Sequence, residues 1–413
     1  MAIDPKEGVV EFSGFKGLRS NVGADGFDVG DLSVALNVDI DDALRLHSRK
    51  GHSAVVVAGV DRDLWADSGA CFGVGSNVLK QILPDYSTVT LRSGLTASRP
   101  LSYVRFGDSV FYANGAENGC VVNGANRTWG IAVPSAPLVT AASGTLRAGK
   151  YQVAVTYLRD DGQESGACRA IVIALADAGG LSVSSISVSA DPSITHKNIY
   201  VSATNGKPLY RAGTIANAAT TFAVSDAPKK VLPLETQFWG PPSVGNLVGR
   251  VGARLLVAVG SRLYPSEPYA PELFDLRKGI PFSSAITMLE TVEHRTEGCW
   301  IGTTESVVWL HGDEPEKWEY DIAADYGVIP GTLYYMDGEV MGDGSAAGDS
   351  IAFFATTRGL GVGLPGGKFQ NLTQERFAYP IQERGAGIVR RHNGMAQFLV
   401  SLQGSETAGN VAS

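Results

Sequence analysis

Short apolar runs alternate with polar turns along most of the chain. The runs have about five residues each, the usual length of a strand, and the turns between them are rich in Gly, Asn, Ser and Thr. We find no stretch with the i, i+3, i+4, i+7 apolar spacing of an amphipathic helix. The pattern therefore predicts an all-β protein built of hairpins. The clearest units are residues 105–124, 250–268, 295–315, 347–367 and 391–404, the last of which stops after one strand, and residues 68–91 form a weaker copy.

The spacing of these units predicts how the hairpins are assembled. After residue 240 they begin about 40 to 50 residues apart, which is the repeat length of propeller blades with four short strands each. We therefore expect a β-propeller of about five to seven blades. A β-sandwich is the alternative, because short strands at regular spacing occur in both architectures.

A closed propeller has to pair the edge strands of its last blade. The final unit, residues 385–404, supplies only about two strands before the C-terminal tail. The N-terminal strands expected at residues 8–15, 33–40 and 44–49 would complete that blade and cover its bare edges. We therefore expect the N-terminal strands to close the ring.

The regular spacing breaks between residues 132 and 240. A Pro-Ser-Ala-Pro linker at residues 134–137 leads into about seven short strands, with Asp-Gly and Asn-Gly hairpin turns. This pattern is typical of an immunoglobulin- or fibronectin-III-like sandwich inserted between blades. The expected parts are 1–132, the N-terminal propeller strands; 133–239, the sandwich; and 240–413, the rest of the propeller.

Composition narrows the classes of function. The net charge of −8 and the pI near 5.4 argue against a site that grips nucleic-acid phosphates. No run approaches the roughly 18 apolar residues of a membrane helix, and the N-terminus lacks a signal-peptide pattern, so we expect cytoplasmic synthesis and no membrane insertion. The four cysteines show no metal-ligand spacing and are expected to be reduced core residues: Cys71, Cys120, Cys168 and Cys299.

Motifs for chemistry are missing from the sequence. It contains no GxSxG, P-loop, GxGxxG or HExxH pattern. Asn37, Asp39, Asp41 and Asp42 lie close together, but Ile40 interrupts them and no glycine follows as a calcium loop requires. We therefore expect these acids to form a charged strand edge that pairs with Arg45 or Arg49, and not a calcium site. The prediction is no enzyme, no catalytic residue, no cofactor and no metal site.

Three stretches carry a likeness to a known family. They are residues 14–52, with "ALNVDIDDALRLHSRKG"; residues 245–289, with "GNLVGRVGARLLVAVGSRLYPSEP"; and residues 298–338 with the following "RGLGVGLPGGKFQNLTQERF". In these stretches the chain resembles the tail hub or nozzle proteins of tailed bacteriophages, related to the packaged-DNA stabilisation proteins of short-tailed phages.

The resemblance implies a structural subunit of the virion tail. Six copies would form a ring below the portal and its adaptor proteins, next to tail needle and fibre proteins. The ring would line the DNA-ejection channel and help to retain packaged DNA, and double-stranded DNA would pass through without specific binding. An acidic wall suits that task, because it repels phosphates. The alternatives are a carbohydrate- or receptor-binding tail module and a glycan-degrading propeller enzyme.

A ring subunit needs interfaces and a channel wall. The interface candidates are aromatic or arginine side chains, the types that anchor most interfaces: Trp239, Trp309, Trp318, Arg45 and Arg49. For the tryptophans, burial between blades is the alternative. The candidates for channel-lining acids are Asp313, Glu314 and Glu316, for which a solvated turn is the alternative.

Overall fold

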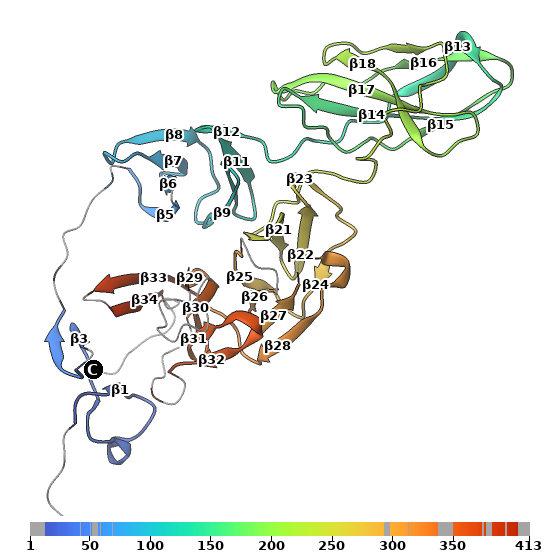
Figure 1. Cartoon of the computed structure of the whole chain (residues 1–413). Coiled ribbons are helices and arrows are strands. Elements are labelled where there is room, and N and C mark those ends of the chain that lie inside the picture. The colour runs from blue at the N-terminus through green and yellow to red at the C-terminus, as the bar shows by residue number, and fades with distance from the viewer. Residues whose placement is uncertain are drawn as a thin grey trace, which may run out of the picture. The chain divides into compact units, whose positions relative to one another are not determined.

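The computed structural model describes residues 13–41, 43–49, 51, 57, 59–67, 69–292, 298–312, 314–337, 350–373, 376, 382–392 and 395–403. The predicted all-β class is confirmed (Figure 1). Helical structure in the described part is restricted to three-residue 3-10 turns at η1 (Ala24–Gly26), η2 (Pro315–Lys317) and η4 (Pro365–Gly367).

The described part of the chain contains five sheets that are each built from four consecutive antiparallel strands. A fifth, short strand, β24, joins the third sheet by pairing with β22, and a two-stranded sheet comes last among the described residues. The sheets are β5–β8 (Arg62–Asp67, Ala70–Gly75, Val78–Ile82, Thr88–Arg92), β9–β12 (Ser102–Phe106, Ser109–Ala113, Asn118–Val122, Ala125–Arg127), β20–β24 (Leu247–Val251, Arg254–Val259, Arg262–Glu267, Ala270–Phe274, Ile280–Pro281), β25–β28 (Ile286–Leu289, Gly298–Thr303, Val307–His311, Tyr320–Ala324), β29–β32 (Tyr334–Asp337, Ser350–Thr356, Gly359–Gly363, Phe369–Asn371) and β33–β34 (Arg384–His392, Met395–Gln403).

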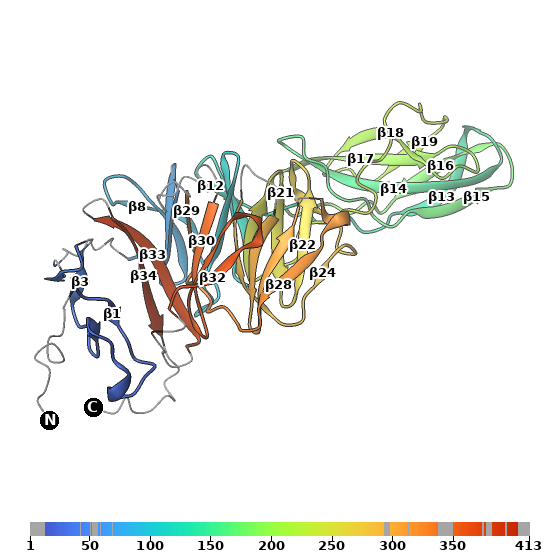
Figure 2. The same cartoon turned by 60° about the horizontal axis from the view of Figure 1, so that its bottom comes forward.

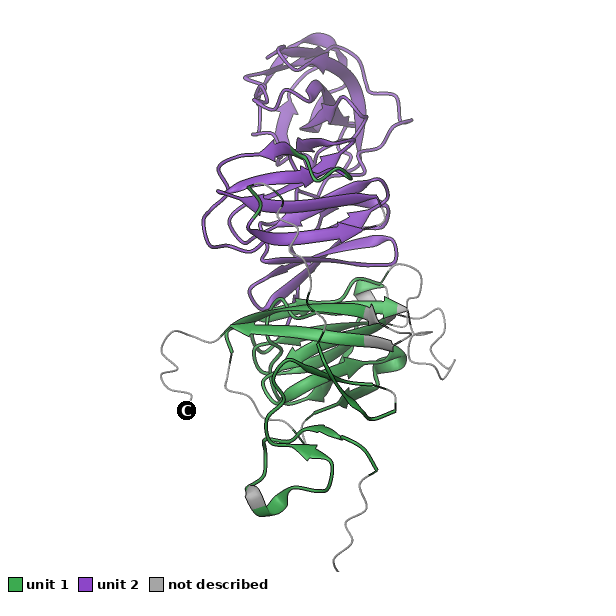
Figure 3. Cartoon of the chain, turned by 90° about the vertical axis from the view of Figure 1, so that its left-hand side faces the viewer, with its two compact units in different colours: residues 1–60, 84–88, 282–413 green, residues 61–83, 89–281 purple. Residues whose placement is uncertain are grey.

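The chain divides into two compact units (Figure 3). Unit 1 contains residues 1–60, 84–88 and 282–413, so both ends of the chain belong to it. Unit 2 contains residues 61–83 and 89–281.

Within unit 2, the sheet β9–β12 is buried on both faces. Successive side chains of a strand point to opposite faces. Val110 and Tyr112 of β10 pack in one core with residues of β6 and β7, such as Phe72 and Leu79. Phe111 and Ala113 of the same strand pack in a second core with residues of β20–β23 and with Trp129. The sheet β9–β12 therefore packs one face against β5–β8 and the other face against β20–β23.

The same alternation occurs within unit 1. Ala352 and Phe354 of β30 pack with Trp300 of β26 and Trp309 of β27. Ile351 and Phe353, on the opposite face of β30, pack with Val362 and with Phe398 of β34, whose ring centroid lies 5.6 Å from that of Phe353.

A β-sandwich occupies residues 138–224 of unit 2, inside the range 133–239 expected for it (Figure 2). One sheet holds the first, fourth and seventh strands, β13 (Leu138–Leu146), β16 (Gly179–Ser184) and β19 (Phe222–Val224). The other holds β14 (Gly149–Arg159), β15 (Ile171–Leu175), β17 (Ile194–Ser202) and β18 (Leu209–Ala216). Both sheets contribute to a common core that includes Tyr151, Val155, Leu181, Ile199 and Val224.

In both predicted hairpin turns of the sandwich, one residue of the Asp-Gly or Asn-Gly pair has a positive φ angle, the conformation that these residue types favour. Gly162 follows Asp161 in the turn after β14 with φ 87°, and Asn205 precedes Gly206 in the turn after β17 with φ 60°. Positive φ is accessible to glycine and tolerated by asparagine, so these dipeptides set where the strands reverse.

A buried arginine joins the sandwich to the preceding sheet. Arg159, at the end of β14, is 4% exposed. Its guanidinium donates to the Thr128 hydroxyl at 3.0 Å and to the Gly130 carbonyl at 3.0 Å, both just after β12. The Thr128 hydroxyl in turn donates to Asp191 of the sandwich at 2.9 Å.

One structural expectation is corrected by the strand pairing. The described N-terminal strands form no ladder with β33 or β34; β3 (Val38–Ile40) pairs with β4 (Leu46–Ser48), and β1 (Gly17–Leu18) pairs with β2 (Asp31–Leu32). Asp41 is the physical reason for the local hairpin, because its carboxylate accepts the Arg45 amide and its carbonyl accepts the Leu44 amide. These bonds close the turn between β3 and β4. The expected strand at residues 8–15 lies mostly outside the described residues.

Phe274 tests whether the stacked sheets depend on their shared cores. This side chain is fully buried, and its ring lies 5.9 Å from that of Trp129. Phe274→Ala should lower the free energy of unfolding by about 3 to 5 kcal/mol, because it removes a buried ring and leaves a cavity. Urea denaturation followed by tryptophan fluorescence measures this change.

The matched control is Phe238→Ala, which truncates a phenylalanine that is 63% exposed. It should cost less than about 1 kcal/mol. Equal losses in the two variants would contradict the burial argument.

Candidate functional site

The N-terminal segment of unit 1 is attached to the C-terminal part of that unit by charged side chains. Asp31, at the start of β2, has a side chain with 0% exposure. One carboxylate oxygen accepts a hydrogen bond from Arg19 at 3.0 Å, and the other accepts one from Arg376. The Ser20 amide also donates to the Arg376 carbonyl at 2.8 Å. A single buried acid thus connects two segments 345 residues apart in the sequence.

Asp39 on β3 repeats this arrangement. Its Oδ1 accepts from Arg49 Nε at 3.1 Å, and its Oδ2 accepts from Arg390 Nη2 on β33 at 2.5 Å. Arg390 is itself oriented by Gln397 of β34, which accepts from its Nε at 2.6 Å. Each aspartate therefore binds one arginine of its own segment and one from the C-terminal part. We refer to Asp31, Asp39 and their four arginines as the aspartate clasp.

The arginines of the clasp keep both acids ionised. Loss of hydration alone would raise the pKa of Asp31, but hydrogen bonds from Arg19, the Asp28 amide and Arg376 outweigh it and hold that pKa below its ordinary value. Burial would likewise raise the pKa of Asp39, and hydrogen bonds from Arg390 and Arg49 lower it.

Asp41, two residues after Asp39, also forms hydrogen bonds within the protein. The Arg45 amide and the His47 ring, whose Nε2 lies 2.7 Å from Asp41 Oδ2, lower the pKa of Asp41. Asp42 lies outside the described residues. In the described part of the chain no three His, Cys, Asp or Glu side chains are grouped so as to hold a metal ion.

The structure separates the two candidate arginines. Arg49 belongs to the clasp, whereas Arg45 is exposed and contacts Asp41 through its backbone amide.

Of the candidate channel acids, Glu314 is exposed and forms an ion pair with Lys317 at 2.5 Å. Asp313 and the side chain of Glu316 lie outside the described residues.

Trp309 is a core residue, which is the alternative that the sequence left open for the three tryptophans. It is 5% exposed and its ring centroid lies 5.0 Å from that of Trp300, its partner across β26 and β27. Gly367, with φ 82°, lies so close to the Trp309 ring that a Cβ there would come within 2.7 Å of it. Trp318 is half-buried, and its Nε1 donates to the Gly312 carbonyl at 3.1 Å.

Trp239 lies in an aromatic and cationic patch on unit 2. It is half-buried, and Lys278 Nζ lies 5.7 Å from its ring centroid. The neighbouring Phe238 is 63% exposed, with the Arg277 guanidinium 4.8 Å above its ring. Arg277 also donates twice to the buried Asp275, at 2.8 Å each, and these bonds lower the pKa of that carboxyl. We call Phe238, Trp239, Arg277 and Lys278 the aromatic patch; it borders a hollow of about 280 Å³.

Sequence reasoning did not find most residues of the clasp or the patch. Asp31, Arg19, Arg376 and Arg390 stand in no recognisable motif, because their partners are far away in the chain. For the patch a signal existed, namely the two aromatic residues directly before Gly240, Pro241 and Pro242.

Comparisons with known proteins give no family for this chain. No family model matches it, and no curated protein matches it. Among solved structures, a match is the extracellular domain of a one-component system from B. thetaiotaomicron, with 12% sequence identity and a TM-score of 0.28. That match covers 82% of this chain and 38% of the other. No helix in the described part of the chain is long and apolar enough to cross a membrane.

Asp31→Asn tests the clasp, because it removes the negative charge that the two arginines share. The amides of residues 15–49 should exchange their hydrogens several-fold faster in this variant at neutral pH, since Arg376 then loses the charge of Asp31 and Arg19 keeps only Asp28. Hydrogen exchange read by mass spectrometry measures this. Asp25→Asn is the control, because Asp25 is exposed in the same segment. Unchanged exchange in Asp31→Asn would contradict the clasp.

The clasp should also open in acid. The ordinary carboxyl pKa is 3.8, and the folded values of Asp31 and Asp39 lie below it. The stabilisation is therefore complete above about pH 4 and is lost as the pH falls through the lower, folded values. In the same exchange experiment, the difference between wild type and Asp31→Asn should shrink over that acidic range. A difference that stayed constant with pH would contradict ionisation as the source.

Proposed function

We propose that this chain is a structural virion protein, a nozzle or hub subunit of a bacteriophage tail. The observation that supports the proposal most is the series of consecutive four-stranded antiparallel sheets, which within each unit bury faces against neighbouring sheets. This is how propeller blades pack, and it is the architecture implied by the sequence resemblance to tail hub and nozzle proteins.

On this proposal the five four-stranded sheets and the final hairpin are blades of a propeller, and the sandwich is an immunoglobulin- or fibronectin-III-like insertion. The aspartate clasp would take the place of a strand ladder between the ends of the chain. Charged side chains would then hold the N-terminal segment beside the last blade.

The proposed role of the subunit is to form a wall. Copies would assemble head to tail into a ring, which closes when the rotation between neighbours is a whole fraction of a turn. The ring would sit below portal and adaptor proteins and contact needle or fibre proteins. The net charge of −8 suits a channel through which DNA passes without being held, because like charges repel over about a Debye length.

The aromatic patch is the proposed contact between subunits. Exposed aromatic side chains with arginine beside them are the residues that contribute most at interfaces, and Phe238 and Arg277 combine both features. Trp318, which is half-buried, is a weaker candidate.

Electron microscopy of negatively stained protein, or of particles that carry it, tests the proposal. The purified full chain should form rings with a central opening. Trp239→Ser together with Phe238→Ser should reduce the ring fraction at least tenfold, because truncation of anchor residues costs about 2 kcal/mol or more each. Tyr269→Ser is the control, because Tyr269 is an aromatic residue of unit 2 that is 83% exposed. Monomers that cleave a polysaccharide would refute the structural role.

A further inference from the structure

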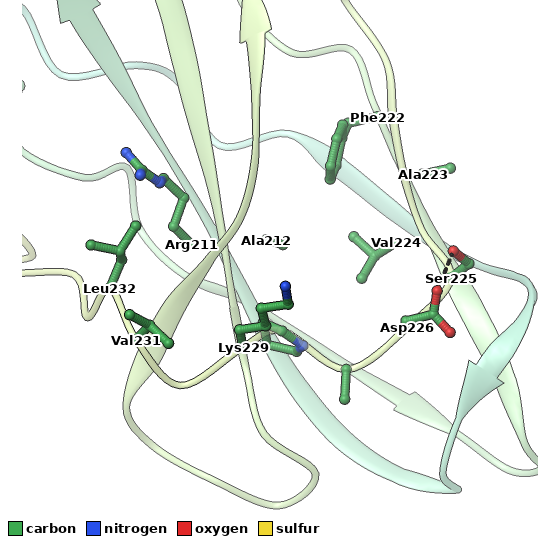
Figure 4. A pocket seen from close by; sticks show the side chains of 12 residues that line it. Arg211, Ala212, Phe222, Ala223, Val224, Ser225, Asp226, Lys229, Val231 and Leu232 are labelled. Atoms are coloured by element: carbon green, nitrogen blue, oxygen red, sulfur yellow. Dashed lines mark hydrogen bonds between the residues drawn. The ribbon is translucent and has the colours of Figure 1, made fainter.

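The sandwich contains a hollow that the proposed tail function does not use. It has a volume of about 530 Å³ and lies between β18 and the segment that follows β19. Figure 4 shows Arg211, Val231 and Leu232 on one side, Phe222, Val224 and Asp226 on the other, and the Lys229 side chain between them. Its volume is in the range of about 300 to 1,000 Å³ that is usual for small-molecule sites.

Two positive charges at this hollow have no carboxylate partner among the described residues. Arg211 and Lys229 are both exposed, and in the described part of the chain neither forms an ion pair with a carboxylate. The hollow has one acid, Asp226, against these two cations, and its carboxylate accepts from the Thr145 hydroxyl at 2.6 Å and from the Ser225 hydroxyl at 3.1 Å. The hollow is therefore cationic within a protein of net charge −8.

Between these charges the hollow has an apolar floor. Phe222 is half-buried and packs directly on Gly213, where an added Cβ would lie 2.4 Å from the ring. Val224 is 4% exposed, and Ala212 lies beside it in the lining. The packing on Gly213 holds the Phe222 ring in place, so the floor is formed before a ligand arrives.

We propose that this hollow binds an acidic saccharide, a sugar ring that carries a carboxylate. The carboxylate would bind Arg211 and Lys229, and the C–H face of the ring would lie on Phe222 and Val224. Hydroxyl groups of the sugar would donate to the free lone pairs of Asp226 and exchange hydrogen bonds with Ser225. This inference rests on the sandwich alone and does not depend on the proposed tail function.

An acidic peptide fits the same hollow less well. A peptide usually binds beside a sheet by pairing with an edge strand, but the edge of β18 is covered next to the hollow. The Arg211 amide donates to the Leu232 carbonyl at 2.9 Å, and the Leu234 amide donates to the Leu209 carbonyl at 2.9 Å. A series of acidic side chains would also meet Asp226, whereas a sugar offers hydroxyl donors to it.

Calorimetric titration of the full chain with trigalacturonate and with sialyllactose tests the proposal. At least one of them should bind, and its uncharged counterpart, galactotriose or lactose, should bind at least tenfold more weakly. Lys229→Ala and Arg211→Ala should each weaken binding about tenfold, since each removes a charge-assisted hydrogen bond. Phe222→Leu should weaken it less. The control is Lys207→Ala, which removes an exposed lysine of the same sandwich that is not part of the hollow.

Three results would overturn the proposal. The first is that neither acid binds at millimolar concentration to protein with a normal unfolding curve. The second is equal binding of the acids and their uncharged counterparts, or equal binding by wild type and the Arg211 and Lys229 variants. The third is that hexaglutamate binds more tightly than both acids and loses affinity in those variants, which would identify a peptide site.

Discussion

The consecutive four-stranded sheets of this protein have to bury their faces without help from helices, since helical structure in the described residues is restricted to three-residue turns. A sheet exposes two faces, and a strand with apolar residues on both needs a neighbour on each side. Val110 and Phe111 on β10, and Phe353 and Phe354 on β30, show the consequence, because adjacent residues of one strand belong to different cores. The stacking of consecutive sheets follows from this requirement, and the placement of the other features depends on it.

The N-terminal segment and the final two-stranded sheet are held together by charged side chains, whereas the four-stranded sheets are held together by shared apolar cores. The final sheet has two strands and packs Phe398 against Phe353, while the N-terminal segment forms its own short hairpin. Charges then join the two segments. A buried carboxylate is stable when cations and hydrogen bonds replace its lost hydration, and both Asp31 and Asp39 have two arginines for this purpose. The attachment is thereby specific for these residues, since an apolar contact would not discriminate between registers.

The sandwich has its own core and is joined to the preceding sheet by polar contacts around Arg159 and Thr128. The sandwich therefore buries its apolar side chains in a core of its own, and its outer surface can bind ligands or partners. The hollow beside Phe222 combines core residues, Phe222 and Val224, with the connecting segment after β19, and the aromatic patch at Phe238 and Trp239 lies in the connection that follows the sandwich. Such connecting segments are where binding residues are commonly placed, because substitutions there do not disturb packing.

The sequence by itself determined the class of the fold and the position of its hairpins. Period-two apolar runs and turn residues such as Gly162 and Asn205 act locally, so they can be read without knowledge of distant partners. Tertiary structure alone decided which surface each strand covers and which charges meet. The pattern could not establish that Trp309 is buried and Trp239 only half-buried, because the exposure of a tryptophan depends on which sheet or segment packs against it. Nor could it pair Asp31 with Arg376, because residues that are 345 positions apart in the sequence meet only in the folded unit.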